Sequence, residues 1–359
     1  MPNTNTLTSI FSAIADAIRG KNGLSTRYYP ADMAAAIAAI PSGGGTDKMA
    51  ERLNGTITAY TSNDVTTLQP YAFYNATSLQ NISLPNAYPR SYVDCGNLFN
   101  SCTNLRSVNL PACTVTGTRM FYNCSNLQSV ALGAQEIIQQ YAFYGCSSLT
   151  TLTMDTTNLG SIGTYAFYQC GLTSFSAPNC LTVDSQAFQQ SALASISFPK
   201  LGKVNSQSFG GCVNLLHAVF EAATHIYGKA LENDSALIDV ALPSVQQVGS
   251  NASTASPFYN CSSLTTVALG RDVATIYSST ASGKALFQAC NSLEKVIIEA
   301  LTPPTLSSGA LWAARTNDYP VAGQMPASFD AFYVPDDSLS LYQQDSNFGL
   351  FTIKPMSQL

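Results

Sequence analysis

Residues 142–149 have the sequence Ala-Phe-Tyr-Gly-Cys-Ser-Ser-Leu, and the apolar residues Leu152 and Met154 follow them. The chain repeats this phrase ten times: a large apolar anchor, a small residue three positions later, a leucine, and an apolar–x–apolar step. The anchors of these ten coils lie 21 to 29 residues apart, and they are Phe73, Phe99, Phe121, Phe143, Phe167, Phe188, Phe209, Leu231, Phe258 and Phe287. A period in the twenties predicts a solenoid, because one unit is too small to bury its own apolar face and must stack on the next.

Within one unit, residues 107–110 alternate polar and apolar, which predicts a short strand that Pro111 ends. A second extended piece follows, such as residues 159–163, and then a compact turn or helical piece that contains the anchor. Stacking such units predicts a right-handed parallel coil with a ladder of strands on one face.

The composition argues against several classes of partner. Charged residues make up 10% of the chain, the net charge is −5, and no run of Lys or Arg occurs, so we expect no nucleic-acid partner. No stretch reaches the ~18 apolar residues of a membrane span, so we expect no membrane insertion. Residues 1–12 lack the positive segment of a secretory signal, so we expect any export to use a different route.

Seven of the ten cysteines stand three positions after an anchor: Cys102, Cys124, Cys146, Cys170, Cys212, Cys261 and Cys290. Stacked coils bring such residues close enough for disulfides, but equivalent side chains point in parallel, and we favour small buried thiols. The chain has two histidines and no Cys-x-x-Cys pair, so no metal or other cofactor is expected.

The repeats resemble the leucine-rich repeats of the BspA-like type, whose pattern runs I-G-x-x-A-F-x-x-C-x-x-L-x-x-V-x-L-P. Residues 161–170 fit it almost position by position, and the resemblance covers residues 56–300. Residues 301–359 resemble the closing unit of that family, with Asp336 or Asp337 expected to cap a short helix that runs to Tyr342. The resemblance implies an α+β repeat fold, a leucine-rich-repeat solenoid with a C-terminal cap.

Residues 1–40 have a different pattern, which predicts a helical hairpin, and residues 41–55 form a Gly-rich linker and entry. The apolar residues expected to anchor the hairpin are Leu7, Ile10, Phe11, Ile14 and Ile18 in its first helix and Met33, Ile37 and Ile40 in its second. So small a hairpin must dock on another surface: the repeats, copies of itself, or another protein. Residues 14–21 and 29–37 resemble a module of tail and tail-fibre proteins from phages of Gram-positive bacteria. This implies attachment to a tail or baseplate protein, and we expect a homo-oligomer, a trimer.

Two insertions predict a binding surface. Ten residues separate Val248 from Phe258 and eleven separate Ile276 from Phe287, where most coils have about five. Insertions in neighbouring coils emerge on one edge, and the residues expected to bind a glycan or protein receptor are Asn251, Thr254, Tyr277, Thr280, Lys284, Trp312, Arg315, Asn317 and Tyr319. The alternative is that these loops are tolerated insertions without function.

A row of tyrosines directly follows the anchors: Tyr74, Tyr122, Tyr144, Tyr168 and Tyr259. Such a row either binds a ligand or packs coil on coil, and we favour packing because aromatic rings have a large area to bury.

No catalytic motif occurs, and the carboxylates Glu221, Asp239, Glu294 and Glu299 stand where strands normally carry polar residues. We therefore expect no catalytic residues and no enzyme. The predicted function is that of a phage or prophage tail-fibre protein that binds a host receptor, located in the virion after synthesis in the bacterial cytoplasm. The alternatives are an extracellular or cell-surface adhesin of the same repeat family and, third, a polysaccharide depolymerase.

Overall fold

The computed structural model describes residues 58–68, 70–89, 91–250, 256–277, 286–307 and 325–359. It contains two compact units, Met1–Asn158 with Cys170–Leu172, and Leu159–Gln169 with Thr173–Leu359. The predicted hairpin of residues 1–40 and the linker of residues 41–55 lie outside the described residues, so both stay predictions.

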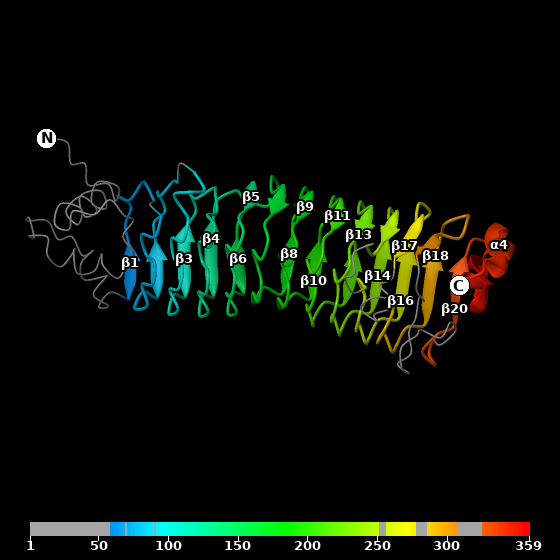
Figure 1. Cartoon of the computed structure of the whole chain (residues 1–359). Helices are drawn as coiled ribbons and strands as arrows, with labels where there is room; N and C mark the ends of the chain where they lie inside the picture. The colour runs from blue at the N-terminus through cyan, green and yellow to red at the C-terminus, as the bar shows by residue number, and fades with distance from the viewer. Residues whose placement is uncertain (1–57, 69, 90, 251–255, 278–285, 308–324) are drawn as a thin grey trace, which may run out of the picture. The chain divides into compact units, whose positions relative to one another are not determined.

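The first unit contains a parallel sheet with one strand from each coil (Figure 1). Its order is β1 (Ala59–Thr61), β2 (Asn81–Ser83), β3 (Ser107–Leu110), β4 (Ser129–Leu132) and β6 (Thr151–Thr153), and the unit also contains β5 (Ile137–Ile138). Val108 pairs with Val130, and both side chains point into the core. The predicted strand of residues 107–110 is confirmed.

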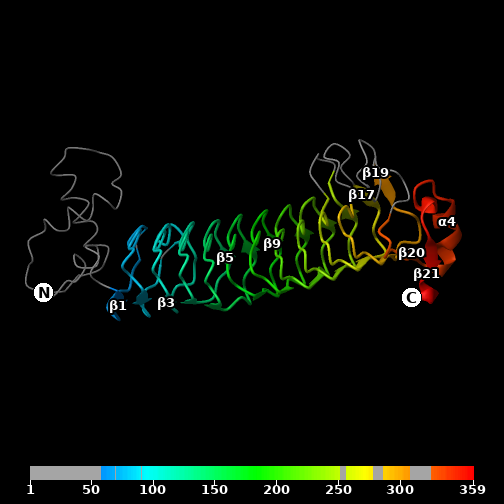
Figure 2. The same ribbon diagram turned by 90° about the horizontal axis from the view of Figure 1, so that it is seen from below.

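The second unit has the same plan. Its larger strands are β8 (Ser174–Ser176), which pairs with β10 (Ser195–Ser197), and then β12 (His217–Val219), β14 (Asp239–Leu242), β16 (Thr266–Leu269), β18 (Lys295–Ile298), β20 (Ala331–Val334) and β21 (Ile353–Pro355). A second ladder contains β7 (Ser161–Ile162), β9 (Thr182–Val183), β11 (Lys203–Val204), β13 (His225–Ile226), β15 (Gln247–Val248), β17 (Thr275–Tyr277) and β19 (Thr305–Ser307). Figure 2 shows β17 and β19 on one side of these coils and β20 and β21 on the other.

The anchors form aromatic stacks in the core of each unit, and the aliphatic anchor Leu231 interrupts the stack of the second unit between Phe209 and Phe258. Phe121 stacks on Phe99 and on Phe143, with ring centroids 5.3 and 5.0 Å apart. In the second unit, Phe188 stacks on Phe167 at 4.9 Å and on Phe209 at 5.5 Å. Coils five and six have one residue fewer before their leucines, in Cys170-Gly171-Leu172 and Ser191-Ala192-Leu193, and Phe167 and Phe188 nevertheless stay stacked.

The segment that carries each anchor is a turn, and among the described residues α-helix occurs only near the C-terminus. Left-handed backbone recurs two positions before and two positions after the anchor, as at Tyr141 (φ 60°) and Gly145 (φ 70°) around Phe143. This geometry turns backbone groups toward the neighbouring coil, and the amide of Phe121 donates to the carbonyl of Ala142 at 2.7 Å. A third hydrogen-bond ladder thus runs through the turns.

All ten cysteines are buried and free, which confirms the prediction made for the seven at the repeated position. Six of those at the repeated position, Cys102, Cys124, Cys146, Cys212, Cys261 and Cys290, donate a hydrogen bond to the anchor carbonyl of the preceding coil, as Cys124 Sγ does to Phe99 O at 3.0 Å. Desolvation raises the pKa of Cys102 and Cys290 to about 12. The cysteine at this position therefore acts as a neutral donor between coils.

The C-terminal cap closes the second unit with η1 (Asp336–Ser338), α4 (Leu339–Gln344), η2 (Phe348–Leu350) and η3 (Met356–Gln358). Buried Tyr342 donates its hydroxyl to Ala300 O at 3.0 Å, which ties α4 to the last coil. The predicted capping role of Asp336 or Asp337 is wrong, because neither α4 nor η1 has a side-chain cap. Asp336 Oδ1 instead accepts from the amide of Ser357 at 3.0 Å.

Candidate functional site

The outward face of the strands differs in chemistry from coil to coil. On β2 and β3 of the first unit its residues are Asn and Ser that bond to one another: Ser107 Oγ donates to Asn81 Oδ1 at 2.7 Å, and Asn109 Nδ2 donates to Ser83 Oγ at 2.9 Å. Such a surface satisfies its own polar groups and offers little to a partner.

In the second unit, β12, β14, β16 and β18 present a mixed face. Each of these strands has two outward-facing residues, which pair in register with those of the next strand. The row at the start of the strands is His217, Asp239, Thr266 and Lys295, and the row two positions later is Val219, Ala241, Ala268 and Ile297. Between these rows, buried Ala218, Val240, Val267 and Val296 point into the core. The period of two along each strand fixes which side chains face outward.

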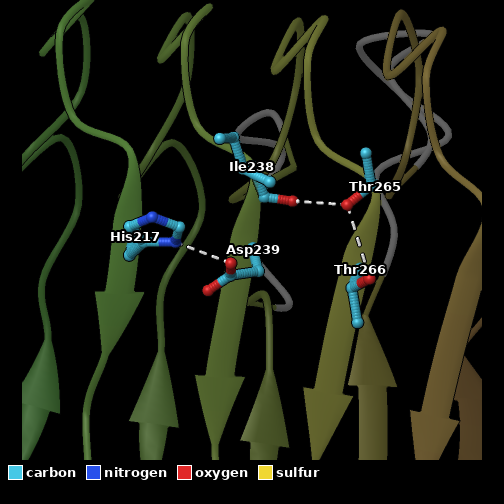
Figure 3. Close-up of polar contacts among 5 residues, drawn as sticks. All are labelled: His217, Ile238, Asp239, Thr265 and Thr266. Atoms are coloured by element: carbon cyan, nitrogen blue, oxygen red, sulfur yellow. Dashed lines mark hydrogen bonds and ion pairs between the residues drawn. The ribbon is translucent and has the colours of Figure 1, made fainter.

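His217 and Asp239 form an exposed pair on this face, with His217 Nδ1 2.6 Å from Asp239 Oδ2 (Figure 3). The carboxylate orients the imidazole ring, and the pair becomes an ion pair when the histidine is protonated. Beside it, Thr265 Oγ1 donates to the carbonyl of Ile238 at 3.0 Å, so this hydroxyl serves the coil contact.

Three exposed aliphatic side chains flank the pair, and we name them the apolar patch: Leu216, Val219 and Ile238, with exposed fractions of 42%, 47% and 38%. The amide of Ile238 donates to Leu216 O at 2.8 Å, so these two residues lie in adjacent coils side by side. The next two coils have Thr265 and Glu294 at this position. The patch is therefore confined to the coils of β12 and β14.

An ion pair lies at the β20–β21 end of the face. Asp330 Oδ1 accepts from Lys354 Nζ at 2.6 Å, and Asp330 Oδ2 accepts from the hydroxyl of Tyr333 at 2.6 Å. The bond from Lys354 and then that from Tyr333 lower the pKa of Asp330, while the same carboxylate raises the pKa of Lys354. These groups bond to one another across the two cap strands.

The four carboxylates considered for catalysis lie at the protein surface. Asp239 bonds to His217, while Glu221, Glu294 and Glu299 are exposed. Within the described ranges, no group of three or more potential ligand side chains could hold a metal ion. The expectations of no enzyme and no cofactor stay predictions.

One predicted receptor residue lies in the described structure. Half-exposed Tyr277 ends β17, in register with Ser307 of β19. The others lie outside the described residues, namely Asn251, Thr254, Thr280, Lys284, Trp312, Arg315, Asn317 and Tyr319, as do the eight hairpin anchors. The loop hypothesis is therefore neither supported nor contradicted.

Two members of the tyrosine row, Tyr122 and Tyr144, pack on each other in the first unit. The rings of Tyr122 and Tyr144 stack with centroids 4.7 Å apart, and the Arg119 guanidinium lies 4.9 Å from the centroid of Tyr141. Ring faces that contact other side chains are not available to a ligand, which favours packing between coils over ligand binding.

The His217–Asp239 pair and the apolar patch were not predicted from the sequence. A signal exists, because His217 and Asp239 stand one repeat apart at the first strand position, and Leu216 and Ile238 precede them. Aligning the repeats column by column would have shown apolar residues where other coils have Gln80, Arg106 or Thr150.

Comparisons with known proteins match the repeats and not the predicted N-terminal hairpin. A family model described as the BspA type leucine rich repeat region matches in six copies, over residues 55–158, 136–256 and 251–308. These matches begin after the predicted hairpin and give the phage-tail resemblance no support. No curated protein matches the chain.

Several solved structures are similar at low identity. A leucine-rich repeat protein from Bacteroides ovatus is 18% identical, with a TM-score of 0.47 and 84% of each chain covered. A leucine rich cell surface protein from Faecalibacterium prausnitzii is 16% identical, with a TM-score of 0.34 and coverage of 84% of this chain and 88% of that one. The pneumococcal vaccine antigen PcpA is 15% identical, with a TM-score of 0.37 and coverage of 82% and 78%. Among the described residues, no helix has the length and apolar character needed to cross a bilayer.

Proposed function

The chain belongs to the BspA-type leucine-rich-repeat family, and on this premise we propose that it is a non-catalytic adhesin of the cell surface or extracellular space. Its partner is a protein, held by the outward face of β12 and β14. The observation that carries the proposal is the apolar patch of Leu216, Val219 and Ile238 around the His217–Asp239 pair.

The chemistry of the patch favours a protein over a glycan. Aliphatic side chains offer no hydrogen bonds to sugar hydroxyls, but they gain roughly 25 cal/mol for each Å² of apolar surface that a partner covers. The pair at the centre supplies a polar contact of defined orientation, which adds specificity to apolar burial. The self-bonded Asn and Ser face of the first unit lacks this combination.

Direct binding tests this proposal. The purified full chain is measured by surface plasmon resonance against a panel of extracellular-matrix proteins, with a glycan array in parallel. We expect a protein ligand whose affinity falls at least about tenfold in the double variant Leu216→Asn, Ile238→Asn. The matched control is Leu181→Asn, because Leu181 is equally aliphatic, 60% exposed and next to the second ladder. Equal losses in both variants, or binding to glycans alone, would overturn the proposed face.

A second experiment addresses location. Mass spectrometry of surface, medium and phage-like particle fractions from the producing strain should find the protein on the surface or in the medium. Stoichiometric recovery in particles would instead support the tail-fibre prediction, with its tail or baseplate partner and trimeric assembly through residues 1–40.

A further inference from the structure

Coil eight departs from the repeat at a buried position. Asp234 stands three residues after the anchor Leu231, where seven other coils have cysteine. Its side chain is completely buried. Its Oδ1 accepts from the amide of Cys212 at 2.8 Å, whereas its Oδ2 has no hydrogen-bond partner.

No cation among the described groups around Asp234 compensates its charge. In the flanking coils, Cys212 and Cys261 are thiols that donate to Phe188 O and Leu231 O. In its own turn, Lys229 Nζ lies 3.8 Å from Glu232 Oε2, so the nearby cation is paired with another carboxylate. An ionised Asp234 would therefore be a buried charge with one backbone donor and an unsatisfied oxygen, which is costly.

We propose that Asp234 is a proton-dependent latch: its carboxyl is neutral in the closed coil, and its ionisation at rising pH opens the coil that carries β14. When the coil opens, the proton leaves the carboxyl for water and the carboxylate becomes solvated. No bond other than that O–H bond is broken.

The direction of the pH effect follows from burial. Burial raises the pKa of Asp234 well above its usual value near 4. The closed coil then binds a proton that the opened coil releases, so the closed form is fully favoured below the pKa of the opened coil. This stability is lost as pH rises toward the pKa of the closed form, and the opening equilibrium constant increases about tenfold for each pH unit.

The latch lies close to the candidate binding face. Ile238 and Asp239 follow Asp234 within the same coil, and Ile238 bonds to Leu216 of the preceding coil. Opening would separate the apolar patch and displace the partner of His217. This regulation of binding rests on the proposed function, whereas the pH-dependent opening does not.

Hydrogen exchange of the full chain tests the latch. Protection factors, corrected for the pH dependence of intrinsic exchange, are measured for residues 229–242 between about pH 5 and pH 8. In the wild type we expect protection to fall up to about tenfold per pH unit. Asp234→Cys restores the residue of the other coils and should flatten this slope, while Asp272→Asn, a change at an exposed carboxylate, should leave it unchanged.

Asp234→Asn provides a second test, because it keeps the shape of the side chain and the Oδ1 acceptor but cannot ionise. Parallel slopes in the wild type and both Asp234 variants would overturn the latch. If protection depends on pH but no protein ligand is found, the latch stands and the proposed function is rejected. If a ligand binds equally well across this pH range, the latch does not regulate binding.

Discussion

At the scale of single residues, the phenylalanine anchors are among the largest fully buried side chains of the core. Phe121 is fully buried between Phe99 and Phe143. Phe121→Ala removes both stacking contacts and leaves a cavity, so we expect a loss of about 3–5 kcal/mol in the free energy of unfolding. Urea denaturation measures this loss, with exposed Tyr88→Ala as the control expected to change stability by less than about 0.5 kcal/mol. Equal effects of the two changes would contradict the role of the stack.

The cysteines provide a second residue-scale prediction. A thiol with a pKa of about 12, as at Cys102 and Cys290, is about one part in ten thousand thiolate at pH 8. We expect Ellman's reagent to modify essentially no thiol of the native protein and all ten thiols after unfolding. If only eight thiols react in the unfolded protein without reductant, Cys95 and Cys113, whose Sγ atoms lie 3.9 Å apart, form a disulfide instead.

At the scale of elements, the turns depend on left-handed backbone. Gly145 has φ 70°, and a Cβ there would lie 2.8 Å from Asn123 Oδ1. Gly145→Ala should therefore destabilise the protein by roughly 1–2 kcal/mol. Gly202 is the matched control, because a Cβ at Gly202 would have its nearest contact at 3.9 Å, with Leu181 O. A lower melting temperature for Gly202→Ala than for Gly145→Ala in thermal denaturation would contradict this account.

The contact of the cap with the last coil is a separate element. Tyr342→Phe removes hydroxyl donation to Ala300 O and Thr302 O while it keeps the buried ring. The buried carbonyl of Ala300 loses its donor, so we expect a loss of about 1–3 kcal/mol in the free energy of unfolding. Hydrogen exchange should show faster opening of α4, and exposed Leu341→Ala serves as the control in the same helix. Unchanged exchange in α4 would mean that apolar packing alone holds it.

The elements differ in how far the sequence could predict them. The strand of residues 107–110 and the buried Phe143 were predictable because burial imposes a period that repeats in every coil. The left-handed turn at Tyr141 was not, because the backbone groups of this turn also bond to the neighbouring coil, as the carbonyl of Ala142 does when it accepts from the amide of Phe121. The outward residues Leu216 and Ile238 obey no packing period, so no single coil reveals them. The cap prediction at Asp336 was wrong because its carboxylate bonds to the distant Ser357.

At the scale of the whole chain, the repeats are solvated with few charges. Charged residues are 10% of the chain, and the net charge of −5 is small for 359 residues. Stability must therefore come mainly from the apolar stack and the hydrogen-bond ladders, to which ion pairs add little. This small contribution of ion pairs relative to apolar packing and hydrogen bonds distinguishes the chain from proteins whose folds depend on networks of surface charge.

The small contribution of ion pairs predicts that the free energy of unfolding responds weakly to salt. At ~1 M ionic strength the Debye length shrinks to about 3 Å, which screens exposed pairs such as Lys354–Asp330. Because few such pairs exist in the described residues, we expect the free energy of unfolding to change by less than about 1 kcal/mol between low and high NaCl. Lys354→Met should remove most of the salt response of the cap, because among the described residues the Lys354–Asp330 pair has the shortest Lys–carboxylate distance, 2.6 Å. A large salt response that survives this substitution would mean that charges outside the described residues contribute to folding.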